Sequence, residues 1–92
     1  MSGGSAARWS VYIVRCADDS LYTGIARNII RRIEEHNLGR IGARYTRARR
    51  PVVLVYHETS DSRSAALKRE RQIKRLTRRR KELLVASSAM MG

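Results

Sequence analysis

The chain is short of cysteine, of acidic residues and of long apolar runs, and each shortage excludes a class of protein. Cys16 is the only cysteine among 92 residues, which excludes an intramolecular disulfide and a multi-cysteine zinc site. It lies in an apolar run, so we expect a small buried side chain. No apolar run is long enough to span a membrane, and no signal-peptide pattern opens the chain. These absences predict one small cytoplasmic domain.

The excess of basic over acidic residues determines the expected partner. Twenty lysines and arginines against eight aspartates and glutamates give a net charge of +12. Such a field suits a polyanion, either a nucleic acid or an anionic membrane surface. Most of the cations are arginines, which bind phosphate through planar, bidentate contacts, although a genome rich in G and C also favours arginine codons. No long helix joins a basic face to a bulky apolar one, so we expect DNA and no membrane.

Strand and helix signals alternate along the chain in a way that predicts an α+β fold. Runs of β-branched and aromatic residues predict strands at 9–16, 21–25 and 52–57, of which the first two form a hairpin. The near-continuous apolar run of the third strand predicts a central position. The order β-β-α-β-α-α then gives a small, three-stranded, mainly antiparallel sheet flanked by helices.

Capping residues predict where the helices begin. Asn28 caps a helix at 29–38, and Asp61 or Ser62 caps a long helix that ends near Leu76.

Further helical turns are expected in the basic segment 42–50 and after Thr77. Three residues of the short last helix are expected in the core: Leu83, Leu84 and Val85. The predicted domain therefore spans 9–86, between flexible ends at 1–8 and 87–92.

One carboxylate interrupts the apolar face of the predicted long helix. Leu67, Glu70 and Ile73 are spaced three apart and share a face. An ionised glutamate that faces a core is costly unless it is paired or binds a metal. Two explanations stay open, namely a salt bridge to Arg32 or another arginine, and a metal ion.

Tyr12 and Tyr22 lie on the two strands of the hairpin, and the hairpin register decides whether they share a face. If residues 18–20 form a three-residue loop, Cys16 opposes Tyr22 and both tyrosines lie on one face. A two-residue loop would place them on opposite faces. The three-residue loop needs a left-handed residue, and Asp19 is the candidate.

Three further residues predict a polar site beside the tyrosines. Gly24 follows Tyr22 inside a strand, where glycine marks a bend or the close approach of another group. Arg32 and His36 are four apart, so they lie along one edge of their helix. Arg32 borders the apolar stripe and can reach over the sheet, although a solvated cation is the simpler interpretation of this residue alone.

Taken together, these residues resemble the GIY-YIG nuclease domain, and most of all the small single-domain bacterial proteins of that family. The likeness covers roughly Trp9 to Leu84 and is also similar to the nuclease subunit of structure-specific endonucleases. Ser10 stands where the first motif opens with glycine, and no asparagine follows Asn37 to match the one that assists some homing-type members. The resemblance is carried, in order, by Val11-Tyr12, Tyr22-Thr23-Gly24, Arg32, His36 and Glu70.

The resemblance implies hydrolysis of a phosphodiester with one divalent metal ion, Mg²⁺ or Mn²⁺, held by Glu70. Arg32 would then neutralise charge on the phosphoryl oxygens. Tyr12 would activate or orient the attacking water, with Tyr22 holding the network. His36 is the alternative base, because its reference pKa lies near neutrality.

Basic residues outside this group are the expected contacts to DNA. They lie in segment 39–50 and at the start of the last helix. Cations at a helix start oppose the helix dipole, so contact with phosphate explains these residues better than a contribution to stability does. A solvated cluster is the alternative. The predicted nucleic-acid-binding residues are Arg40, Arg44, Tyr45, Arg47, Arg49, Arg50, Arg78, Arg79 and Arg80.

The leading hypothesis is a metal-dependent DNA endonuclease that cuts branched, flapped or single-stranded DNA in repair or recombination. One alternative is a nucleic-acid-binding module that does not cut. Another is a nuclease subunit that needs a protein partner for activity.

Overall fold

Three strands form one antiparallel sheet in the computed structural model, which describes residues 8–38 and 44–91 (residues 44, 45 and 88–91 by their backbone only). β1 (Trp9–Arg15) lies between β2 (Leu21–Ala26) and β3 (Val53–Ser60), so the strand order is β2-β1-β3. The predicted three-stranded α+β fold is confirmed. The central position predicted for the third strand is wrong, because β3 is an edge strand.

β1 takes the centre because both of its faces are covered. Residues Val11 to Val14 are all at most 1% exposed, and their side chains alternate between the two faces of the sheet. No residue of β3 is fully buried, and Val53 is 60% exposed. A continuous apolar run is therefore compatible with an edge strand, and burial of successive residues identifies the centre.

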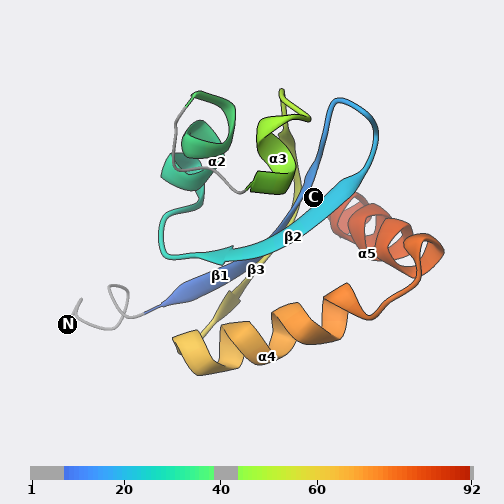
Figure 1. Cartoon of the computed structure of the whole chain (residues 1–92). Helices are drawn as coiled ribbons and strands as arrows, with labels where there is room; N and C mark the ends of the chain where they lie inside the picture. The colour runs from blue at the N-terminus through green and yellow to red at the C-terminus, as the bar shows by residue number, and fades with distance from the viewer. Residues whose placement is uncertain (1–7, 39–43, 92) are drawn as a thin grey trace.

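The described residues form four helices: α2 (Ile29–Leu38), α3 (Arg44–Arg47), α4 (Arg63–Lys74) and α5 (Arg78–Met91). Figure 1 shows α2 and α3 on one side of the sheet and α4 and α5 on the other. The single turn of α3 confirms the prediction for that segment. α5 is longer than predicted, since it continues through 87–91, where the sequence predicted a tail. None of these helices is both long and apolar enough to cross a membrane.

Side-chain caps begin three of the helices, as the sequence predicted. In each, the side-chain oxygen accepts the backbone N–H of the residue three positions later: Asn28 at 3.0 Å, Ser62 at 3.0 Å and Thr77 at 3.2 Å. Ser62, rather than Asp61, is the cap of α4. Removal of such a cap typically costs about 1 kcal/mol of stability.

The core has two parts, one on each face of the sheet. On the face covered by α2, a cluster of buried residues includes Cys16, which is buried as predicted, and Ile33 of α2 packs against it. On the other face, residues of β1 pack against α4 and α5. The buried members there are Val11, Ile13, Ala66 and Ile73.

The apolar residues of α5 do not all enter the core. Leu84 and Val85 pack against the second cluster, whereas Leu83 is 60% exposed. Three consecutive helical residues are about 100° apart and cannot all face one layer. The prediction for Leu83 is therefore wrong.

The β1–β2 hairpin places both tyrosines on one face, with a register two residues away from the one considered above. Val14, and not Cys16, opposes Tyr22. The Cys16 N–H donates to the Ser20 carbonyl at 2.8 Å, which leaves 17–19 as the three-residue loop. Asp19 takes the left-handed conformation, with φ at 70°. A shift of two residues preserves side-chain alternation, so the shared face survives.

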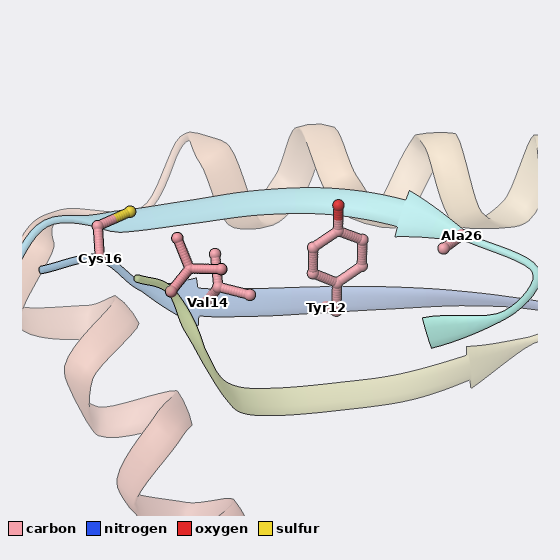
Figure 2. Packing of buried hydrophobic residues seen from close by; sticks show 5 residues of the cluster. Tyr12, Val14, Cys16 and Ala26 are labelled. Atoms are coloured by element: carbon pink, nitrogen blue, oxygen red, sulfur yellow. The ribbon is translucent and has the colours of Figure 1, made fainter. Parts of the chain in front are cut away.

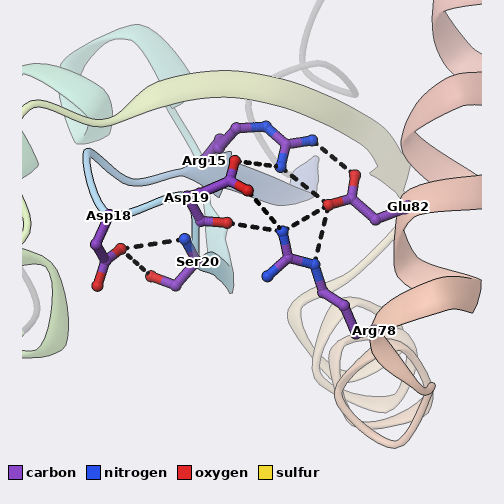
Figure 3. A network of polar contacts seen from close by, with 6 residues as sticks. All are labelled: Arg15, Asp18, Asp19, Ser20, Arg78 and Glu82. Atoms are coloured by element: carbon purple, nitrogen blue, oxygen red, sulfur yellow. Dashed lines mark hydrogen bonds and ion pairs between the residues drawn. The ribbon is translucent and has the colours of Figure 1, made fainter.

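A polar network ties the hairpin loop to the start of α5 (Figure 3). Arg15 binds both carboxylate oxygens of Glu82, at 2.7 and 2.9 Å. Arg78 also pairs with Glu82, at 2.7 Å, and donates to the Asp19 carbonyl at 2.7 Å. Bidentate contacts between arginine and carboxylate fix geometry as well as adding energy. The network therefore joins the start of α5 to the hairpin loop, in addition to the core contacts of Leu84 and Val85.

Candidate active site

The side chain of Tyr12 lies across β2, one of the two edge strands, at the residue of β2 that has no side chain. This residue is Gly24, which pairs with Tyr12 across the two strands. A Cβ atom added to Gly24 would lie 2.6 Å from the Tyr12 hydroxyl oxygen and 2.8 Å from Cζ. Figure 2 shows the ring standing beside β2 with its hydroxyl over the β2 ribbon. The glycine is therefore required by the close approach of the phenol.

The Tyr12 hydroxyl begins a buried chain of hydrogen bonds. It is 2.8 Å from Nε2 of His36, and Nδ1 of His36 is 2.7 Å from Oγ1 of Thr46. All three residues are at most 1% exposed. The Tyr22 ring packs edge-on against the same imidazole, with ring centroids 5.5 Å apart. Both tyrosines and His36 therefore meet in one polar cluster inside the core.

Thr46 was not identified from the sequence. It comes from the single turn of α3, in a segment where arginines dominate. A threonine in a helical turn is common, and its partner is ten residues earlier in the chain. No local pattern indicates this contact, so only the packing of α3 against α2 could reveal it.

Burial keeps both Tyr12 and His36 neutral near pH 7. Desolvation raises the pKa of Tyr12 to about 12, and the neighbouring Tyr22 and Glu70 add to that rise while Arg32 opposes it. Desolvation also lowers the pKa of His36, and the charges of Arg32 and Arg50 lower it further. A neutral imidazole has one N–H and one free lone pair. The hydrogen-bond chain therefore places a proton acceptor, the imidazole of His36, beside the protonated phenol of Tyr12.

Arg32 lies next to this hydrogen-bond chain, and one of its hydrogen-bond donors, Nε–H, has no acceptor among the described residues. Its Nη1 donates to Glu35 at 3.0 Å, and its guanidinium lowers the pKa of the Tyr12 hydroxyl, first by hydrogen bonding and then by its charge. Its Nε is buried and has no hydrogen-bond acceptor among the described residues. Such an orphan donor is costly to bury. It fits an acceptor that arrives with a ligand, and a phosphate oxygen has the matching charge.

Glu70 is half-buried on α4, with 16% of its side chain exposed. Its carboxylate is 3.3 Å from the ammonium of Lys74, one turn further along the helix. No salt bridge joins it to Arg32 or to another arginine whose side chain is described, so that explanation for its position fails. Its charge raises the pKa of Tyr12. The charge of Glu70 therefore reaches the Tyr12 hydroxyl, although α4 packs on the other face of the sheet.

The residues present fit a metal ion that needs only one protein carboxylate. The described part of the chain contains no group of three or more histidines, cysteines, aspartates or glutamates placed to hold a metal. Mg²⁺ commonly keeps several waters and is bound by one or two carboxylates together with substrate phosphate. Glu70 can supply that single ligand if Lys74 releases it.

The residues predicted to bind DNA fall into three groups. Arg40, and the side chains of Arg44 and Tyr45, lie outside the described residues. Exposed side chains without an assigned structural contact are those of Arg47, Arg79 and Arg80.

The remaining three predicted arginines make structural contacts. Arg49 pairs with Asp18 at 2.9 Å, and Arg78 belongs to the network around Glu82. Arg50 donates from Nε to the carbonyl of His36 at 2.6 Å, so it helps to position the histidine.

Comparisons with known proteins agree on one family. The family model described as the GIY-YIG catalytic domain matches residues 8–83. A UPF0213 protein of Desulfotalea psychrophila is 62% identical over 80 residues, which cover 87% of this chain and 73% of that protein. A UPF0213 protein of Natronomonas pharaonis is 54% identical over 81 residues, which cover 88% and 94%.

A solved structure adds support at the level of the fold. The solution structure of a UPF0213 protein from Bacillus halodurans is 43% identical, and the match covers 86% of this chain and 83% of that one with a TM-score of 0.55. The matched family range contains the buried hydrogen-bond chain, Arg32 and Glu70. The protein therefore belongs to the GIY-YIG catalytic domain family, among the small single-domain UPF0213 proteins.

Proposed function

We propose that this protein hydrolyses phosphodiester bonds in DNA, with a divalent metal ion held by Glu70. The family is one of endonucleases that generally use divalent metals, so a nuclease activity is the starting point. The observation that supports the specific proposal is the buried hydrogen-bond chain from Tyr12 through His36 to Thr46, next to Arg32, whose Nε has no acceptor among the described residues. Ordinary core packing does not require so many polar groups in one place.

The proton acceptor in this proposal is His36, and Tyr12 passes the proton to it. At a pKa of about 12, roughly one Tyr12 in 10⁵ is ionised at pH 7, so a free phenolate is too rare to act as the base. A water at the phenol oxygen can instead give up its proton as Tyr12 transfers its own to Nε2 of His36. Nδ1–H then donates to Thr46 throughout, which keeps the imidazole in the required tautomer.

The other residues handle charge on the phosphate. Attack forms a bond from the water oxygen to phosphorus and breaks the bond to the 3′ oxygen, which keeps the electron pair and takes a proton from solvent. Arg32 offers its Nε–H to a phosphoryl oxygen as a donor that is already in place when the charge develops. A metal bound at Glu70 would add Lewis-acid charge at the same phosphate.

The test is cleavage of plasmid, single-stranded, flapped and four-way-junction DNA in Mg²⁺, Mn²⁺ or EDTA. Tyr12→Phe should lower the cleavage rate about 10²- to 10⁴-fold while binding is retained. Tyr56→Phe is the matched control, because this phenol hydrogen-bonds Glu58 on β3 outside the site. The panel also tests the proposed preference for branched, flapped or single-stranded DNA.

Two outcomes would redirect the proposal. Tight DNA binding with no metal-dependent cleavage of any substrate would overturn it and leave a binding module. Cleavage that appears only when cell extract is added would show that the chain needs a protein partner.

A further inference from the structure

A basic groove of about 450 Å³ lies beside Arg32, and neither the sequence nor the proposed chemistry assigns it a role. It lies at one end of the sheet, where residues from the start of β1, the end of β2, α2 and the start of α4 line it (Figure 1). The volume lies within the range of small-ligand sites. Its principal lining residues are Trp9, Arg27, Arg31, Arg32, Glu35 and Arg63.

The groove combines an aromatic surface with an excess of positive charge. The guanidinium carbons of Arg27 and Arg63 lie 5.8 and 5.7 Å from the centroid of the Trp9 ring, so both arginines make cation–π contacts with it. Among the described residues that line the groove, Glu35 is the only acid, and it pairs with Arg31 at 3.5 Å and with Arg32 at 3.0 Å. Four arginines and one carboxylate therefore give the lining a net positive charge.

The groove is continuous with the candidate active site through Arg32. That residue lines the groove, and its charge also reaches the Tyr12 hydroxyl. A ligand that spans both must therefore present an anionic group at Arg32 and a further anionic group with a flat apolar face at Trp9. A nucleic-acid strand has this repeat, because each phosphate is followed by a base.

We propose that the groove binds one unpaired nucleotide next to the phosphate that is cut, with its base stacked on Trp9 and its phosphate held by Arg27 and Arg63. The identity of the strand as DNA rests on the proposed function. On binding, the guanidinium groups exchange their contact with the indole for charge-assisted hydrogen bonds to phosphate. The indole face becomes available to a base, as in other single-strand sites that combine a cationic groove with an aromatic platform.

Trp9 is the only tryptophan in the chain, so the protein carries its own reporter. The experiment titrates the full chain in EDTA with a short single-stranded oligonucleotide labelled at one end. Anisotropy of the label measures binding, and intrinsic fluorescence measures contact with Trp9. We expect strong quenching of Trp9 that saturates together with the anisotropy. An oligonucleotide with abasic sites should bind through its phosphates but quench far less.

Variants separate stacking, charge and packing. Because stacking of one base contributes about 1–3 kcal/mol, Trp9→Leu should weaken binding about tenfold or more, whereas Trp9→Phe keeps a ring and should retain most of the affinity. Arg27→Gln and Arg63→Gln should each weaken binding and reduce the salt dependence by about one charge. Arg75→Gln is the matched control, since it removes one exposed charge at the far end of α4.

Two results would overturn the inference. One is saturated binding without a change in Trp9 fluorescence, or equal quenching by the abasic strand. The other is equal loss of affinity in Arg27→Gln, Arg63→Gln and Arg75→Gln. The inference fails independently of the proposed function if DNA is cut normally while Trp9 remains unquenched. If Trp9 is quenched and the groove variants weaken binding but no substrate is cut, the groove binds a nucleotide as inferred and the proposed hydrolysis of DNA is wrong.

Discussion

Replacement of Gly24 by alanine should destabilise the protein, although alanine is usually the better residue. Inside a strand, the loss of glycine's backbone freedom normally stabilises by about 0.5–1 kcal/mol. Here the new methyl group would lie 2.6 Å from the Tyr12 hydroxyl oxygen and 2.8 Å from its Cζ. Overpacking of this kind costs about 1–3 kcal/mol. The cost of the clash exceeds this gain over most of that range, and we expect a net loss of up to about 2.5 kcal/mol.

The same change should reduce catalysis, because the ring can only move away from β2. Tyr12 is 1% exposed, so any movement disturbs its 2.8 Å contact with His36. We expect Gly24→Ala to lower the cleavage rate by at least tenfold, beyond what the lost stability explains at a temperature where the variant is folded.

Thermal and urea denaturation measure the stability, and a loss of 1 kcal/mol should lower the Tm by about 4–8 °C in a domain of this size. Thr59→Ala, an exposed change on β3, is the control and should stay within about 0.5 kcal/mol of the parent protein. Adding Tyr12→Phe to Gly24→Ala should cost less than the sum of the two changes, since the shortest contact disappears. A Gly24→Ala protein with normal stability and normal cleavage would refute the packing argument.

Three further predictions test the charges of the molecule. Glu70→Gln should abolish metal-dependent cleavage yet leave the Tm in EDTA nearly unchanged, because Glu70 has an exposed lysine as its ion partner; a large fall in Tm would instead make it a structural residue. Burial lowers the pKa of His36, so His36 stabilises the fold above its unfolded pKa of about 6.5, and this contribution is lost as the pH falls toward the folded value. Urea midpoints measured between pH 5 and 8 should show this loss of stability at the acid end. The control His57→Gln should show the same loss as the parent protein, because His57 is exposed. The cleavage rate should also decline as the pH falls over this range. Hydrogen bonds from Arg15 lower the pKa of Glu82 to about 2, so Glu82→Gln should lower the Tm at pH 7. The difference in Tm between the variant and the parent protein should vanish as the pH approaches 2. A difference in Tm that persists in acid would show that charge is not the cause.

Features that depend on local sequence were predicted well. Asn28, Ser62 and Thr77 begin helices because each cap bonds a backbone N–H three residues away. The face shared by Tyr12 and Tyr22 follows from strand alternation, and it survived a register shift because the shift was even.

Features that depend on distant partners were not predictable. Thr46 meets His36 only because α3 folds back on α2, and no pattern in the sequence links the two. The place of β3 at the sheet edge depends on which strand the helices cover from both sides. Arginine patterns indicate charge but not partners, so structural contacts such as Arg50 to the His36 carbonyl were indistinguishable from DNA contacts.

The second core cluster joins the first strand of the chain to its last helix. Val11 and Ile13 are covered by α4 and by Leu84 and Val85 of α5, while Arg15 holds Glu82. That face of the central strand is therefore fully covered only when both α4 and α5 have packed on it. A chain truncated before α5 would leave part of this apolar face exposed and would be prone to aggregate.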